Sequence, residues 1–128
     1  MHRVFLLAAL ILVAGSIPAA DRAVPRAATR MIASVHAAAA ANDQKALTRL
    51  MAKDFVSSFG GDGGPAEALT LWASDPTYFQ NLAEATSPPC QLQSPGYVQC
   101  PHNPGIGFRA GFKLAGGKWE FASFVAGD

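Results

Sequence analysis

A two-residue glycine turn near the end of the chain constrains the fold more than any other feature. Gly116 and Gly117 separate two runs of alternating apolar and polar residues, a pattern typical of a β-hairpin closed by two residues. The symmetric register places eight side chains on one face, all apolar except Ser123: the pairs Leu114–Trp119, Phe112–Phe121, Ala110–Ser123 and Phe108–Val125. Lys113 meets Glu120 on the other face as an opposite-charge pair. A slip of one residue would place the aromatic rings in water, so we expect a fixed register and an apolar sheet face that helices must cover.

Two amphipathic helices are predicted in the first half of the chain. Pro25 suits the first turn of a helix. Apolar residues then recur at helical spacing, namely Ala28, Met31, Ile32, Val35 and Ala39. Asn42-Asp43 interrupts this helix and caps a second one that runs out around residues 53–55, with Leu47, Leu50 and Met51 facing inward. Residues 37–41 carry no bulky side chain, so another backbone can approach them closely.

The middle of the chain predicts a short extended piece and then a bent helix. Residues 55–59 form the extended piece, and a glycine-rich turn around Asp62 follows it. Pro65 begins a helix with Leu69 and Trp72 facing inward. Asp75-Pro76 renews the helix with a bend, and the helical spacing continues through Tyr78, Phe79 and Leu82 until Ser87-Pro88-Pro89.

The N-terminus is typical of an export signal. A positive start, Met1-His2-Arg3, precedes an apolar run from Val4 to Ala14 and then small residues, and the run is too short to span a bilayer. We expect cleavage after Ala20, with Ser16 as the alternative, which leaves one domain over residues 21–128 that works in the periplasm or outside the cell. An uncleaved N-terminus, and with it a membrane-tethered accessory protein, is the competing interpretation.

The export signal also decides how the two cysteines are interpreted. Cys90 and Cys100 flank a small predicted hairpin with a three-residue loop that ends on Gly96, where a positive φ is wanted. Two cysteines in an exported chain most simply form one disulfide. Neither a metal nor a cofactor is expected, because Cys-Pro-His102 is not a recognised zinc-ligand spacing.

Charge excludes one class of partner. Without Arg3 the chain keeps nine basic and nine acidic residues, so nucleic acid is not an expected partner. The distribution is uneven: between Lys53 and Arg109 there is no Lys or Arg but there are five acidic residues. That stretch predicts either a locally acidic surface or an ordinary solvated face.

Three segments together resemble the nuclear-transport-factor-2-like superfamily, which includes SnoaL-like polyketide cyclases and ketosteroid isomerases. They are the helix-to-helix joint at His36–Asp43, the exit at Leu50–Val56 and the last strand at Gly117–Gly127. The resemblance implies an α+β fold with N-terminal helices packed on a small curved antiparallel sheet that ends in a hairpin. The chain has room only for the cysteine hairpin between its third helix and its last hairpin, so we expect a shallow cone.

The catalytic pattern of the isomerases in this superfamily does not carry over. The first helix holds no tyrosine, and the two tyrosines, Tyr78 and Tyr97, come late in the chain. From the residues themselves, His36, Asp54 and Asp62 are candidates for acid or base chemistry. Each also has a structural interpretation: a satisfied histidine at a helix boundary, the end of a helix, and a turn residue.

Four aromatic residues are predicted to belong to the core or to line a ligand pocket: Trp72, Tyr78, Phe112 and Trp119. The favoured function is non-catalytic binding of a small apolar ligand or of a protein partner, with a homodimer as one possible assembly. The alternative is an isomerase or dehydratase acting on a polyketide-like or steroid-like substrate.

Overall fold

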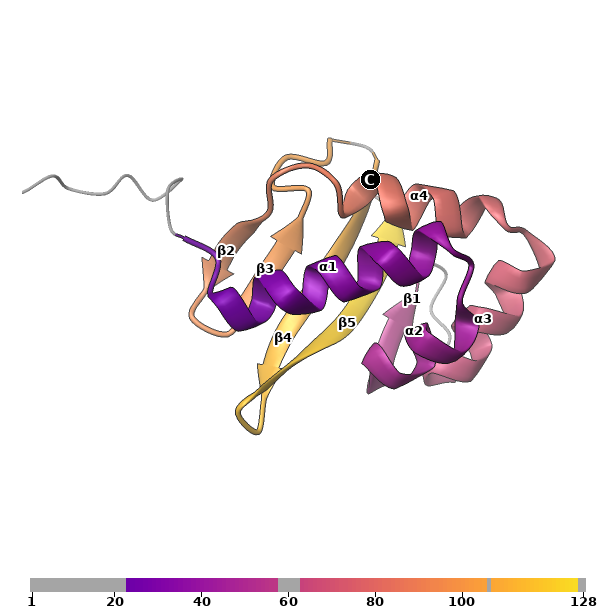
Figure 1. Ribbon diagram of the computed structural model, residues 1–128, viewed down its shortest axis with the longest axis horizontal. Coiled ribbons are helices and arrows are strands. Elements are labelled where there is room, and N and C mark those ends of the chain that lie inside the picture. The colour runs from indigo at the N-terminus through magenta and orange to yellow at the C-terminus, as the bar shows by residue number, and fades with distance from the viewer. Residues whose placement is uncertain (1–22, 58–62, 106, 127–128) are drawn as a thin grey trace, which may run out of the picture.

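The computed structural model describes residues 23–57, 63–105 and 107–126. The predicted signal peptide at residues 1–20 and the candidate Asp62 lie outside the described residues. Within them the chain forms four helices, which pack on one face of a five-stranded sheet (Figure 1). The sheet does not close on itself, and the predicted α+β class is confirmed.

The first two helices begin where capping chemistry predicts. Helix α1 spans Arg26–Ala40, directly after Pro25, and buries Ala28, Ile32, Val35, Ala38 and Ala39. Asn42 then takes a left-handed φ of 51°, and an Asp43 carboxylate oxygen accepts from the backbone N–H of Ala46, 3.1 Å away, to cap α2 at Gln44–Leu50. Helix α2 is shorter than predicted, because strand β1 (Met51–Ser57) starts immediately after Leu50.

The bent helix is confirmed as two helices, α3 (Gly64–Ser74) and α4 (Thr77–Ala85). Asp75 Oδ1 accepts hydrogen bonds from Thr77, from its backbone N–H at 3.3 Å and from its hydroxyl at 2.6 Å, which renews the helix after the bend. The predicted inward residues are buried in both helices: Leu69, Trp72, Phe79 and Leu82.

The sheet has the strand order β1-β5-β4-β3-β2, with β2 at Gln91–Ser94, β3 at Tyr97–Cys100, β4 at Phe108–Ala115 and β5 at Lys118–Ala126. Three of the four pairings are antiparallel, as predicted. Strand β1 instead pairs in parallel with β5, so the sheet is mixed. The connection from β1 to the other strands passes through α3 and α4, which supplies the long crossover that a parallel pair needs.

The glycine hairpin keeps its predicted register through Phe112–Phe121 and loses it beyond that pair. A bulge at Ala122 shifts β5, so Ala110 lies opposite Phe124 and Gly111 opposite Ser123. The predicted pairs Ala110–Ser123 and Phe108–Val125 are therefore wrong. The bulge has a clear energetic reason: it brings Phe124 into the core at 1% exposure and sends Ser123 to the opposite face.

The disulfide between Cys90 and Cys100 is present, although its hairpin is tighter than predicted. Ser94 pairs directly with Tyr97, and Gln93 is the extra residue of an irregularity in β2. The connection is therefore a two-residue turn at Pro95-Gly96, and Gly96 is not among the positive-φ residues. The three-residue loop was wrong because it assumed a regular ladder up to the turn.

Candidate functional site

The four predicted pocket residues lie in one packed hydrophobic cluster between the helices and the sheet. Trp72 is its centre: the Trp72 ring meets the rings of Phe55, Phe79 and Phe124 edge-on, with centroids 5.9, 5.9 and 5.7 Å away. Tyr78 stacks on the same indole. Phe112 is fully buried and stacks on Phe121, while Trp119 is 8% exposed. The four predicted residues are thus packed against other side chains between the helices and the sheet.

His36 links two helices. Its Nδ1 lies 2.9 Å from the carbonyl oxygen of Ala83 and 3.1 Å from the hydroxyl of Thr86, so it joins α1 to α4. Because a carbonyl can only accept, Nδ1 carries the hydrogen and donates it. This contact fixes the ring on the helix side of the sheet.

Asp54 lies on the opposite side of the sheet. It is exposed, with 76% of its side chain accessible, and its two carboxylate oxygens lie 2.6 and 2.8 Å from Lys113 Nζ. Lys113 is paired with Glu120 in the strand register, as predicted, but its ammonium reaches past β5 to Asp54. His36 and Asp54 therefore face different sides of the molecule, and the structure does not bring them together.

The ion pair predicts a measurable pH effect. The hydrogen bond from Lys113, a backbone hydrogen bond and the charge of Lys113 together hold the pKa of Asp54 below its ordinary value. The contribution of this pair to stability is therefore complete above the pKa of the unfolded chain, and it is lost as the pH falls through the lowered folded pKa. In Lys113→Met we expect the pKa of Asp54 to return toward its ordinary value, as followed by carboxyl-carbon NMR. Lys118→Met, which removes a charge at the adjacent turn, should leave it unchanged; equal titrations in both variants would contradict the pairing.

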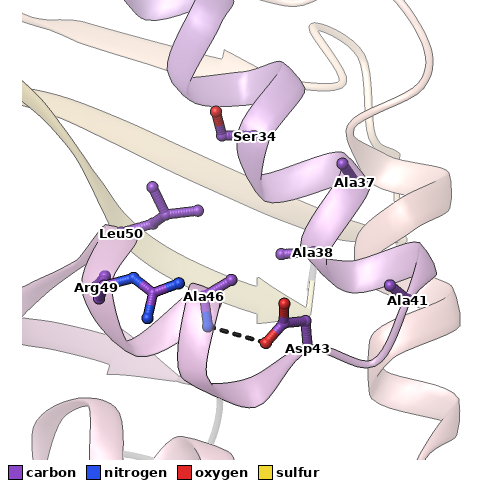
Figure 2. Close-up of a pocket in the computed structure, with 8 residues that line it drawn as sticks. All are labelled: Ser34, Ala37, Ala38, Ala41, Asp43, Ala46, Arg49 and Leu50. Carbon is purple, nitrogen blue, oxygen red and sulfur yellow. Dashed lines mark hydrogen bonds between the residues drawn. The ribbon is translucent and has the colours of Figure 1, made fainter.

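A shallow hollow of about 380 Å³ lies between α1 and α2 (Figure 2). Half of its lining residues are alanines, as expected for a stretch without bulk. Two polar groups lie on its α2 side: Asp43, which is occupied in capping Ala46, and the exposed Arg49. The full lining is Ser34, Ala37, Ala38, Ala41, Asp43, Ala46, Arg49 and Leu50. With its one carboxylate used as a helix cap, this hollow offers little for acid–base chemistry.

A second hollow, of about 300 Å³, lies between α4 and the segment that leads into β4. Phe108 and Ala85 line it together with two prolines, and Asn81 and Glu84 supply its polar groups. None of the four predicted pocket residues lines either of these two hollows.

The sheet face opposite the helices carries a polar cluster that sequence reasoning did not single out. The Tyr97 hydroxyl lies 3.4 Å from the Ser123 hydroxyl. Both hydroxyls stand over Gly111, where an added Cβ would collide with them. Beside them Gln99 is 9% exposed, and the Nε of Arg109 is buried without a hydrogen-bond partner among the described residues. The available signal was the alternation of β4, which sets Arg109, Gly111 and Lys113 opposite in direction to Phe108, Ala110 and Phe112.

Among the described residues, no group of three His, Cys, Asp or Glu side chains could hold a metal ion, and both cysteines are consumed by the disulfide. In the same residues no helix combines the length and the apolar character needed to cross a bilayer.

Comparison with known proteins yields fold-level similarity. No protein-family model matches the chain, and no curated protein sequence matches it. One similar crystal structure is an NTF-2-like protein of unknown function from Shewanella oneidensis MR-1, with 11% identity, a TM-score of 0.49, and coverage of 80% of this chain and 97% of that one. Another is an NTF2-like protein of unknown function from Pseudomonas putida KT2440, with 12% identity, a TM-score of 0.42, and coverage of 75% and 80%. The chain is similar to both of these structures, and the similarity says nothing about its activity.

Proposed function

We propose that this chain is an exported, non-catalytic binding domain whose partner is a protein. One observation carries the proposal: among the described residues, aromatic rings around the buried Trp72 pack the interior between helices and sheet, where a substrate would otherwise have to fit. The acid–base candidates His36 and Asp54 lie on different sides of the sheet. Export is supported by the N-terminal sequence and by the disulfide, since disulfides persist in oxidising compartments.

The binding surface in this proposal is the sheet face that no described helix covers. Tyr97, Arg109 and Ser123 on this face are half-buried by their neighbours, and Val56 is 49% exposed. The buried Nε of Arg109, which has no partner among the described residues, is costly, and an acceptor that binds the rest of the guanidinium offsets part of that cost. The face is thus suited to association.

We take the occupant to be a second copy of the chain, because the charges of this face complement themselves. Lys113 is already neutralised by Asp54. Arg109 and Glu120 have no ion-pair partner in the described part of the structure, and they lie on opposite sides of the Gly111–Ser123 pair. A two-fold axis through that pair sets Arg109 of each copy against Glu120 of the other, as an isologous interface requires.

Charge reversal tests this surface. We expect the wild-type protein to sediment as a dimer, and Arg109→Glu or Glu120→Arg alone to raise the dimer dissociation constant by about tenfold or more, because like charges then meet. The double variant should recover the dimer. Arg49→Glu on α2 is the matched control and should change nothing.

A monomeric wild type, or a double variant no better than the single ones, would contradict the interface. Circular dichroism on each variant separates misfolding from dissociation. The non-catalytic part of the proposal has its own test: turnover of a conjugated ketosteroid or a polyketide analogue by the purified protein would overturn it.

A further inference from the structure

We propose that the hollow between α4 and the segment leading into β4 binds a small organic ammonium ion. Its volume of about 300 Å³ lies at the lower end of the range for small-molecule pockets. Its lining combines apolar and polar groups: one aromatic ring and two proline rings are apolar, and one carboxylate and one amide are polar. That combination suits a ligand with an apolar body and a single positive charge.

The apolar part of the hollow is rigid. The Phe108 ring stacks on Phe124 with centroids 4.8 Å apart and meets Tyr78 edge-on at 6.0 Å. Pro101 and Pro104 have no side-chain rotamers to lose, and the backbone N–H of Gly107 donates to the carbonyl of Pro104 at 2.9 Å. A ligand therefore orders little of the protein when it binds, which favours affinity for a small molecule.

The polar part selects a cation. Asn81 and Glu84 are one helical turn apart on α4 and both line the hollow, and within the described residues neither side chain makes a hydrogen bond or an ion pair. An ammonium group can donate to the carboxylate of Glu84 and to the amide oxygen of Asn81, and an aromatic ring beside it adds cation–π attraction.

The surrounding charge points the same way. Between Lys53 and Arg109 the sequence has five acidic residues and no Lys or Arg. Arg109, although adjacent to Phe108, is turned to the other face of the sheet by the alternation of β4. Of these acids it is Glu84 that lines the hollow, so its carboxylate attracts a cation, and not an anion, there.

The test uses 2-phenylethylammonium as the probe and 2-phenylethanol as its neutral analogue, followed by amide NMR of the purified protein. We expect saturable shifts at residues 81–85 and 107–108, with the alcohol binding at least about threefold more weakly. Glu84→Gln should weaken ammonium binding by about two- to fivefold, within the range for an exposed ion pair. Glu67→Gln, an exposed acid on α3, is the matched control and should leave binding unchanged.

Equal affinities for the ammonium ion and the alcohol would overturn the proposal, as would unchanged binding in Glu84→Gln or shifts located elsewhere on the protein. Both Glu84 and Glu67 are exposed, so neither substitution threatens folding. The hollow lies apart from Arg109 and Glu120, so failure of this test leaves the proposed dimer standing.

Discussion

Phe121→Ala is expected to lower the free energy of unfolding by about 3–5 kcal/mol, the range for truncating a fully buried aromatic residue. Phe121 has no exposed surface. Its ring lies 4.8 Å from that of Phe55 and 5.4 Å from that of Phe112, so it ties β1 to β4 across β5. Alanine would leave a cavity lined by rigid rings that cannot collapse to fill it. A loss of this size is a large part of the stability of a small domain.

Denaturant unfolding of the purified protein checks this expectation. Leu71→Ala is the control, because Leu71 is 38% exposed on α3 and its truncation should change stability by no more than about 0.5 kcal/mol. If Phe121→Ala were as mild as Leu71→Ala, the filled interior on which the proposed function rests would be wrong.

Loss of the disulfide is expected to cost about 3 kcal/mol. In the loop-entropy model, the bridge from Cys90 to Cys100 closes a short loop and removes that much conformational freedom from the unfolded chain. Cys100 is fully buried, so alanine is the appropriate replacement at both positions. We therefore expect the double variant Cys90→Ala/Cys100→Ala to unfold at a clearly lower denaturant concentration.

Reductant supplies the internal control for this prediction. Wild-type protein in reductant should unfold close to the midpoint of the double variant, and the double variant should not respond to reductant at all. Two reactive thiols in the native, non-reduced protein would contradict the bridge itself.

Local chemistry made much of the fold predictable. Asp43 and Asp75 each place a side-chain acceptor at a helix start, and the structure uses both in that way. The paired glycines at 116–117 set the turn and the register of the first four pairs of the last hairpin. These features need nothing from distant parts of the chain, which is why sequence reasoning found them.

Features that depend on tertiary packing were missed. The bulge at Ala122 lets Phe121 and Phe124, three residues apart, both face the core, which a regular strand of period two does not allow. That aromatic spacing was the available signal. The parallel pairing of β1 had no local signal, because it depends on where α3 and α4 return the chain.

The residues of the candidate site, too, depend on tertiary packing that the local sequence does not reveal. Asp54 was assigned to a helix end and lies instead in β1, where its partner Lys113 is far away in sequence. Arg109 could not be identified as a surface candidate from the sequence. Its buried Nε and its position across from Val125 follow from strand pairing and not from neighbouring residues.

Native mass spectrometry of the protein recovered after export is the decisive measurement, because it reports processing, disulfide and assembly together. We expect a dimer of chains that lack residues 1–20, or 1–16 with the alternative cleavage, each lighter by the two thiol hydrogens lost to the Cys90–Cys100 bond. A monomer that retains its N-terminal residues and carries both free thiols would contradict it.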